Sequence, residues 1–582
     1  MLPRLMLLCA LLATSARGAV APITLDGAFD DWATLPPVVT DATGDDGSSG
    51  VDFHRVWAAN DHRYFFLRFE TGAEVQGDEQ QSLRLYLDTD MNAGTGVSFA
   101  GIGADLVWDF GQREGDFRGS PVRHPDVGLL LAPTVSATDF EIALRLDARP
   151  AGGSALFPGS QVRFVLRDAS GGGDLVPDAG AVTVTIEAAA ADDPAIPLAK
   201  IDPDHLRVAA FNVENNGLFE GGSRQSAFTR ILNAIDADVW VLNELWDHGA
   251  AETASRVESL LPAGSGLSWD AVKRDSGNVV VSRYPIVDSW EILPGSRLTG
   301  ALIDLPSPDT PDVLVIAAHF SCCTADFQRQ EQADALVAFV RDAQTPGGDI
   351  DLPADTPIVA AGDFNLVGWR QQLETILSGD IQNEGAFGPD HAPDWDGSAF
   401  DLPLSTHTDQ RVAHTWRNDF SSFYPGILDF AFVTGSVVDL GRDYVLDTRT
   451  MRVDRLATFG LQADDSERAS DHNPRVLDLV LTPATDAPVA PREASLRVAP
   501  NPFNPRTTIS FSTAREGTVT LDLLDLSGRK VRTLLDGRRA RGEHAIGWDG
   551  RDDAGMRVAS GVYTVRLRTS DGVETRKVTL VE

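Results

Sequence analysis

The spacing of apolar residues divides the chain into three regions. Residues 19–188 and 496–582 alternate apolar and polar positions over short runs between Gly-, Asp- and Pro-rich turns, as in YFFLRFE at 64–70. A period of two is that of a strand with one buried face, and many short strands at close spacing are typical of β-sandwiches. We therefore predict an all-β sandwich domain at each end of the chain.

The middle region, residues 201–481, follows another pattern. Continuous apolar runs such as VWVLN at 239–243 and VLVIAA at 313–318 alternate with stretches in which apolar residues recur at helical spacing. Such runs predict buried strands, and their alternation with helices predicts an α/β domain. Ala- and Pro-containing linkers at 189–200 and 482–495 separate the regions. We therefore predict a multidomain chain whose central α/β domain is flanked by two all-β sandwich domains.

The first 18 residues have the features of a signal peptide. Arg4 precedes an apolar stretch at 5–13, and the small residues Ala16 and Gly18 are spaced for signal peptidase. The apolar stretch is much shorter than the roughly 20 residues that a membrane-spanning helix needs. We therefore predict that residues 1–18 direct export.

The chain is strongly acidic, with 85 Asp+Glu against 49 Lys+Arg and a formal net charge of −36. Residues 201–484 hold 44 acidic and 19 basic residues, a net charge of −25. This composition argues against tight, nonspecific binding of nucleic acid, because affinity for the phosphate backbone depends on basic side chains. The 43% hydrophobic content excludes wholesale disorder, and 3 Cys exclude a disulfide scaffold.

Polar residues that can bind metal or transfer protons stand at the ends of the apolar runs in the middle region. In an α/β domain the strand ends are where the sheet presents its functional site. A single Asp or Asn in such a place is usually a turn former, but here the placement is repeated along one domain. The residues concerned are Asn212, Glu244, His319, Asp363, Asn365, Asp429, Asp471 and His472.

Several of these residues belong to motifs. Glu244 closes an LNE triplet, residues 362–365 read GDFN, and residues 470–472 read SDH. Together with GNVVVSRYPI at 277–286, these motifs resemble those of the endonuclease/exonuclease/phosphatase superfamily, which has the deoxyribonuclease-I-like fold, over roughly residues 206–481. The resemblance implies a central four-layer α/β sandwich that hydrolyses a phosphoester bond with a divalent cation, Mg²⁺ or Mn²⁺.

The residue types suit metal binding independently of the resemblance. Glu244 and Asn212 offer oxygen ligands, which Mg²⁺ prefers to nitrogen or sulfur, and Asp471 can add a further ligand. A cation at this position would neutralise charge on the phosphate oxygens and stabilise the leaving group.

The remaining strand-end residues suit proton transfer and positioning. His472 is the candidate general base for an attacking water, because an imidazole titrates near neutral pH. Asp429 would hold the other ring nitrogen and stabilise the imidazolium, as a carboxylate does in a catalytic triad. We expect His319 to donate to a phosphate oxygen or assist departure of the leaving group. Asp363 and Asn365 would position water and phosphate.

The sequence leaves the substrate open. A secreted nuclease, of low affinity and high salt sensitivity because of the acidic composition, is our first hypothesis. The alternative is a sphingomyelinase-type phospholipase acting on a phospholipid headgroup, in which Phe387, Trp395 and Phe400 would touch a membrane instead of packing on their own domain. A small-molecule phosphatase and a surface-attached binding protein with an inert core are further alternatives.

The N-terminal domain, with ITLDGAFDDW at 23–32 and LYLDTDMNAGTG at 85–96, is similar to sandwich modules related to family 9 carbohydrate-binding modules. The resemblance implies contact with a glycan or a cell surface. Asp88, Asp90 and Asn92 have the alternating oxygen spacing of a Ca²⁺ loop, and an Asp-rich turn is the alternative. Three tryptophans could stack on a sugar, but core packing is our expectation for Trp32, Trp57 and Trp108.

The C-terminal domain reads APNPFNP at 499–505 and GVYTVRL at 561–567. It resembles the immunoglobulin-like domain of the flagellar hook-capping protein, as reused in C-terminal sorting domains of bacterial type IX secretion substrates. The resemblance implies contact with export machinery and a protein that is secreted or attached to a bacterial cell surface. A spacer domain is the alternative.

Overall fold

The structure is a computed structural model that divides the chain into two compact units, Met1–Ala484 and Thr485–Glu582. It describes residues 16–17, 19–44, 50–77, 82–150, 153–170, 173–306, 310–481 and, within 496–580, all but 500, 502, 504–505, 514–516, 525–529, 540–541, 553–555, 559–560 and 570–571. Most of the expected signal peptide (1–18) and the whole linker 482–495 therefore lie outside the described residues. Among the described residues, no helix combines the length and apolar character needed to cross a membrane.

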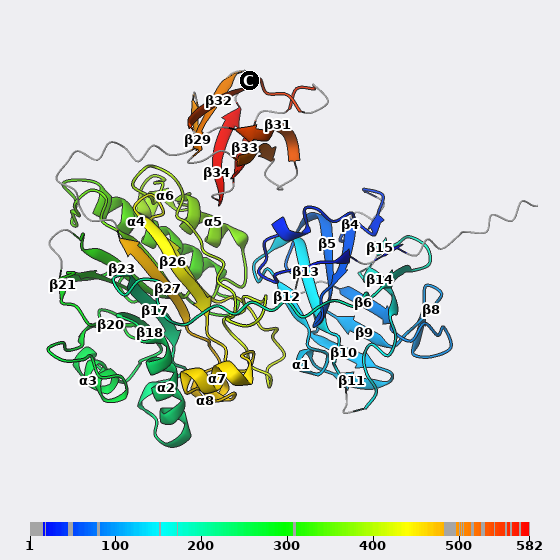
Figure 1. Cartoon of the computed structure of the whole chain (residues 1–582), viewed down its shortest axis with the longest axis horizontal. Helices are drawn as coiled ribbons and strands as arrows, with labels where there is room; N and C mark the ends of the chain where they lie inside the picture. The colour runs from blue at the N-terminus through cyan, green and yellow to red at the C-terminus, as the bar shows by residue number, and fades with distance from the viewer. Residues whose placement is uncertain are drawn as a thin grey trace, which may run out of the picture. The chain divides into compact units, whose positions relative to one another are not determined.

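The first unit begins with a two-sheet sandwich (Figure 1). The larger sheet contains β1 (Ala16–Arg17), β6 (Leu83–Asp88), β9 (Leu106–Asp109), β10 (Glu114–Phe117), β11 (Ser120–Val122), β14 (Gln161–Asp168), β15 (Leu175–Val176) and β16 (Val182–Thr185). The other sheet contains β2 (Ala19–Val20), β3 (Val39–Thr40), β4 (Phe53–Asn60), β5 (Tyr64–Val75), β12 (Leu130–Ala132) and β13 (Ala137–Arg145). Outside the two sheets lie a hairpin, a short helix and a 3-10 turn: β7 (Val97–Phe99), β8 (Ile102–Ala104), α1 (His124–Val127) and η1 (Asp30–Trp32).

The alternating segments form this sandwich because their apolar faces pack on one another. Phe65, Leu67 and Phe69 of β5 share one buried cluster with Leu85 and Leu87 of β6 in the opposite sheet. The tryptophans that the sequence offers for sugar stacking are buried in the cores, as expected: Trp32 at 0% exposure, Trp57 at 4% and Trp108 at 0%.

The middle of the chain is an α/β domain with two sheets. The first has the order β19-β20-β18-β17-β27-β26, with β17 (Leu206–Asn212), β18 (Val239–Asn243), β19 (Asp270–Val272), β20 (Val279–Ser282), β26 (Val438–Val445) and β27 (Arg475–Leu481). The second has the order β21-β22-β23-β24-β25, with β21 (Ile286–Glu291), β22 (Leu298–Ile303), β23 (Val313–His319), β24 (Ile358–Asp363) and β25 (Asp429–Val433). The helices are α2 (Gly222–Ile235), α3 (Ala250–Leu260), α4 (Asp326–Gln344), α5 (Arg370–Ser378), α6 (Glu384–Phe387), α7 (Val453–Phe459) and α8 (Asp465–Ala469), with a 3-10 turn η3 (Gly217–Phe219).

Three apolar clusters hold this domain together. One joins the two sheets, for example through Val241 of β18 and Val315 of β23. A second packs α2 and α3 on the first sheet, and a third packs α4 and α5 on the second sheet. Figure 1 shows these helix pairs on opposite sides of the paired sheets. The expectation of a multidomain chain with a central α/β domain is confirmed.

The N-terminal sandwich and the α/β domain each contribute a side chain to the core of the other. Tyr424, from the long segment before β25, belongs to the sandwich core, and its hydroxyl accepts a hydrogen bond from Trp108 Nε1 at 2.9 Å. In return, Val135 of the sandwich lies in the core between α4 and its sheet. The backbone of Leu25 pairs with that of Arg411 at 2.9 Å and with that of Ala413 at 3.1 Å. These two predicted domains therefore form a single compact unit.

The C-terminal unit is a smaller pair of sheets. One contains β28 (Leu496–Ala499), β29 (Thr507–Thr513) and β32 (Gly542–Trp548), and the other β30 (Gly517–Leu524), β31 (Lys530–Arg539), β33 (Gly561–Thr569) and β34 (Gly572–Leu580). Trp548 is 1% exposed at the centre of its core.

Candidate active site

Strand register brings three predicted residues into one row. In the second sheet of the α/β domain, His319 at the end of β23 lies opposite Asp363 at the end of β24. Asp363 in turn lies opposite Asp429, the first residue of β25. Neighbouring residues in register have their Cα atoms about 5 Å apart, so the three side chains meet at one sheet edge. The strand-end pattern in the sequence thus reflects a shared position in space.

His472 completes this row from the chain segment before β27. Its Nδ1 lies 2.8 Å from Asp429 Oδ2, and its Nε2 lies 3.7 Å from Asp363 Oδ2. His472 is 5% exposed and Asp429 is fully buried. Burial disfavours the imidazolium, but the charges of Asp429 and Asp363 outweigh it and raise the pKa of His472 to about 10. The pairing of His472 with Asp429 is the geometry expected of a base and its orienting carboxylate.

In contrast to His472, Asp363 and His319 are both shifted by burial towards their uncharged forms. Burial of Asp363, 2% exposed, is the largest influence on its carboxyl and raises its pKa to about 7, against the lowering effect of His472. His319 is 5% exposed, and burial together with the positive charge of Arg297 holds its pKa well below the usual range. His319 is therefore a neutral imidazole whose Nε2 lies 3.6 Å from Asp363.

Glu244 and Asn212 face this row from the first sheet. Asn212 ends β17, opposite Asn243 of β18, and Glu244 follows directly with a positive φ of 64°. Such a conformation is strained for a residue with a side chain and is common at functional sites. Glu244 Oε2 accepts a hydrogen bond from the backbone of Asn215 at 2.7 Å, and Glu244 Oε1 lies 4.0 Å from His319 Nε2.

Asn212 differs from the simple ligand that the sequence suggested. Its Nδ2 donates to Glu244 at 3.1 Å and to Asp363 at 3.0 Å, while its Oδ1 accepts from the backbone of Glu214. The amide therefore bridges two carboxylates, and its oxygen would have to turn to reach a cation. Amide orientation follows the hydrogen-bond partners present, so an added cation favours the rotated form.

Asp471 and Asn365 lie in the same site. Asp471 Oδ2 accepts a hydrogen bond from Trp416 Nε1 at 3.0 Å. Asn365 has a positive φ of 47°, and its Nδ2 donates to the carbonyl of Phe320 at 3.1 Å. The structure thus gathers all eight residues that the sequence singled out in the middle region.

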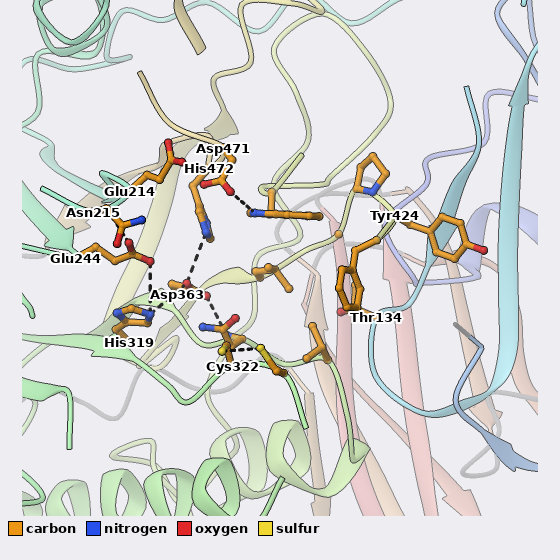
Figure 2. A pocket seen from close by; sticks show the side chains of 18 of the residues that line it. Thr134, Glu214, Asn215, Glu244, His319, Cys322, Asp363, Tyr424, Asp471 and His472 are labelled. Atoms are coloured by element: carbon orange, nitrogen blue, oxygen red, sulfur yellow. Dashed lines mark hydrogen bonds and ion pairs between the residues drawn. The ribbon is translucent and has the colours of Figure 1, made fainter. Parts of the chain in front are cut away.

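Six of the eight residues line a pocket of about 480 Å³, while Asn212 and Asp429 lie behind its lining and hold Asp363 and His472 through hydrogen bonds. Figure 2 shows Glu214, Asn215, Glu244 and His319 on one side of it and Thr134 and Tyr424 on the other. Sequence reasoning missed Glu214, Asn215 and Arg297, which also line the pocket. A signal for the first two was present, since VENN directly follows the strand that ends at Asn212.

The charge in the pocket suits a divalent cation. Glu214, Glu244, Asp363 and Asp471 line it, and among the described residues that do so Arg297 is the one Arg or Lys. Burial and the neighbouring charge of Asp471 raise the pKa of Glu214, even though Arg224 pairs with this carboxylate at 2.8 Å. Hard oxygen ligands in excess over basic groups fit Mg²⁺ or Mn²⁺.

The expected Ca²⁺ loop in the N-terminal domain is arranged differently. Asp88 and Asp90 lie near Asp105, and the side chain of Asn92 instead accepts a hydrogen bond from the backbone of Gly94. Arg118 pairs with Asp90 and Asp105 at 2.8 Å each, and Asp88 pairs with an arginine of β14. Arginine side chains thus pair with all three carboxylates, and Ca²⁺ binding at this loop stays a prediction.

Comparison with known families places two domains in the chain. A model of the endonuclease/exonuclease/phosphatase family matches residues 209–472, and a model of the FlgD Ig-like domain matches residues 503–572. The resemblances of the middle and C-terminal regions to these two families are thereby confirmed, and that of the N-terminal domain to carbohydrate-binding modules stays a prediction. The comparison with curated protein sequences finds no match.

Several solved structures are similar to about half of the chain. TDP2 from D. rerio, complexed with a single-strand DNA product, is 15% identical with a TM-score of 0.31, covering 48% of this chain and 99% of that one. ANGEL2, a 2′,3′-cyclic phosphatase in complex with adenosine-2′,3′-vanadate, is 16% identical with a TM-score of 0.33, covering 49% and 97%. Beta toxin from Staphylococcus aureus is 18% identical with a TM-score of 0.27, covering 47% and 99%.

Proposed function

We propose that this chain, which carries a domain of the endonuclease/exonuclease/phosphatase family, is a secreted, divalent-metal-dependent phosphodiesterase with nucleic acid as its first candidate substrate. The observation that carries the proposal is the buried His472–Asp429 pair at 2.8 Å, opening onto a pocket lined by four carboxylates. Members of the family are hydrolases that act on phosphoester bonds, and this pocket supplies the groups that such a reaction needs.

Each side chain of the candidate active site has a separate role in the proposed reaction. Asp429 holds Nδ1 of His472, so Nε2 is the nitrogen that takes a proton from an attacking water. Neutral His319 donates a hydrogen bond to a phosphate oxygen or to the departing group. Asp363 and Asn365, which also line the pocket, orient the water and the phosphate.

Glu244, Asp471 and a rotated Asn212 would hold the cation, with Glu214 as an additional carboxylate. When bound there, a divalent cation supplies positive charge that stabilises the phosphorus-bound oxygens and the leaving group. The strained backbone at Glu244 and the hydrogen bond from Asn215 fix one carboxylate in place before a ligand arrives.

Specific contacts favour some of the alternative functions over others. The aromatic segment that a phospholipase would press into a membrane is folded onto its own domain: Phe400 is 3% exposed, and Trp395 Nε1 donates to the carbonyl of Thr356. This arrangement favours a nuclease or a small-molecule phosphatase over a sphingomyelinase-type enzyme. The binding-protein alternative would leave the buried His472–Asp429 pair without a use.

Hydrolysis of bis(p-nitrophenyl) phosphate, single-stranded DNA and sphingomyelin vesicles by the full chain, with Mg²⁺ or with chelator, tests the proposal. We expect turnover of the first two with Mg²⁺ and loss of activity in His472→Ala. Full activity in chelator would contradict the metal dependence. Turnover of sphingomyelin alone would favour the phospholipase, and metal binding without turnover would favour an inert core.

Export and attachment form a separate part of the proposal. The signal-like residues 1–18 and the FlgD Ig-like domain at 503–572 support a protein that is secreted or held at a bacterial cell surface by its C-terminal domain. The N-terminal sandwich would contact a glycan or the cell surface. Detection of the chain in the medium, and its retention in the cell when residues 496–582 are deleted, test the first two points.

A further inference from the structure

The candidate active-site pocket has a polar end and an apolar end. The polar end holds the carboxylates and histidines described above. At the other end lie Trp416, Phe423, Leu428 and Pro425 of the α/β domain. The two ends adjoin, because Leu428 directly precedes Asp429 and Trp416 forms a β-bridge with His472. A group placed against these apolar side chains is therefore next to the base and its carboxylate.

The N-terminal sandwich closes the apolar end. Leu131, Pro133 and Thr134 line the pocket from the sandwich side. Thr134 Oγ1 donates to the carbonyl of Leu366 at 2.8 Å, and the backbone of Ser136 donates to the carbonyl of Gly368 at 2.9 Å. These bonds and the inserted Tyr424 fix the sandwich wall relative to the catalytic strands (Figure 2). Residues of the N-terminal sandwich thus form one wall of the pocket.

Two aromatic side chains, those of Trp416 and Phe423, line the apolar end. The residues beside them are Leu131, Pro133, Pro425 and Leu428, which offer no counter-charge to a cationic group. An uncharged aromatic ring can pack on these side chains, whereas an unpaired charge buried among them is costly. The pocket volume of about 480 Å³ is in the range of sites for small organic ligands.

We propose that the sandwich and the α/β domain together form a subsite for an uncharged aromatic group carried by the phosphoester, such as one unpaired nucleobase or an aryl ring. The proposal deepens and rests on the proposed phosphoesterase function. It gives the N-terminal sandwich a role in substrate selection. A pocket of about 480 Å³ has room for one small ring system, so an unpaired base of a single strand or of a strand end fits it better than a base pair held within a duplex.

Binding of phosphonates to the full chain in Mg²⁺, measured by calorimetry, tests the subsite without requiring turnover. The probes are phenylphosphonate, methylphosphonate and phosphocholine. We expect phenylphosphonate to bind at least about tenfold more tightly than methylphosphonate, because the ring adds apolar surface removed from water. Phosphocholine should bind no more tightly than methylphosphonate.

Two variants locate the effect. Phe423→Ala removes a pocket ring that is 45% exposed, and Thr134→Phe fills the pocket from the sandwich side. Both should bring the phenyl-to-methyl ratio close to one. Phe327→Ala is the matched control, since Phe327 is 77% exposed and lies outside the pocket lining. It should leave the ratio unchanged.

The outcomes separate the subsite from the enzyme. Equal binding of the two phosphonates, tightest binding of phosphocholine, or no binding of any probe would overturn the subsite. A ratio that falls equally in Phe327→Ala would do the same. Selective phenylphosphonate binding without hydrolysis of any phosphodiester would support the subsite and refute the proposed function.

Discussion

The contact between Asp429 and His472 gives a quantitative prediction. Asp429→Asn keeps the shape of the side chain and removes its charge. Asp429 is 0% exposed, so water cannot replace that charge. Raising the pKa of His472 from 6.5 to about 10 corresponds to about 5 kcal/mol in favour of the imidazolium. Coulomb's law gives about 4 kcal/mol for two unit charges about 4 Å apart at an effective dielectric constant of about 20.

Asp429 is the strongest of the charges that offset the cost of burying the imidazolium, ahead of Asp363. Since general base catalysis with an oriented histidine contributes about 10²- to 10⁴-fold, we expect kcat to fall within that range in Asp429→Asn. Loss of the negative charge also lowers the pKa of His472. The acid limb of the pH–rate profile should therefore move to lower pH by more than about one unit.

Steady-state hydrolysis of bis(p-nitrophenyl) phosphate between pH 5 and pH 10, at saturating Mg²⁺, measures both quantities. The control is Asp288→Asn on β21, an exposed aspartate whose replacement should leave kcat and the pH profile unchanged. A loss of kcat smaller than threefold, or an acid limb that stays in place, would refute the assignment of His472 as the base.

Three further changes have outcomes that follow from contacts in the structure. Glu244→Gln should raise the Mg²⁺ concentration needed for half-maximal activity, measured in a Mg²⁺ titration. The increase should exceed the roughly 10-fold that is typical of losing a group that supports a metal ligand. An unchanged Mg²⁺ requirement would show that Glu244 is not a ligand. Tyr424→Phe should lower the free energy of unfolding of the first unit in urea by about 1–3 kcal/mol, because the buried Nε1 of Trp108 loses its acceptor; an unaltered midpoint would count against the interlocked domains. His124 is 1% exposed, and burial lowers its pKa to about 4, so the unfolded chain takes up a proton below its ordinary pKa while the folded chain does not. Stability should therefore fall as the pH drops from 7 towards 4, by about 2 kcal/mol at pH 5, and His124→Gln should weaken this dependence in thermal unfolding.

Much of the fold could be predicted from the local spacing of apolar residues. The period-two segments became strands of two sandwiches, and the helical spacing of Phe228, Ile231, Leu232 and Ile235 became the buried face of α2. These features follow from the chain itself, because each element must bury its own apolar face. The site residues could also be predicted, since each stands at or near one end of an apolar run, where the strands of a sheet present side chains to a functional site.

Register and packing between distant segments decided the rest. That His319, Asp363 and Asp429 lie in one row depends on how β23, β24 and β25 pair, which no local spacing states. The amide of Asn212 bridges Glu244 and Asp363, a contact that depends on how the two sheets pack and that the strand-end pattern does not predict. Asp105, from the bend between β8 and β9, likewise joins Asp88 and Asp90 in one group that the spacing at 88–92 does not predict.

The N-terminal sandwich shows most clearly which features the sequence determined and which the tertiary structure decided. Its sequence specified a β-sandwich because alternating apolar residues can be buried only by a second sheet. The insertion of Tyr424 into its core, and the placing of Leu131 and Thr134 in the active-site pocket, were decided by the tertiary structure alone. Contacts between residues some 300 positions apart depend on complementary shape and on buried hydrogen bonds, and neither leaves a period in the sequence.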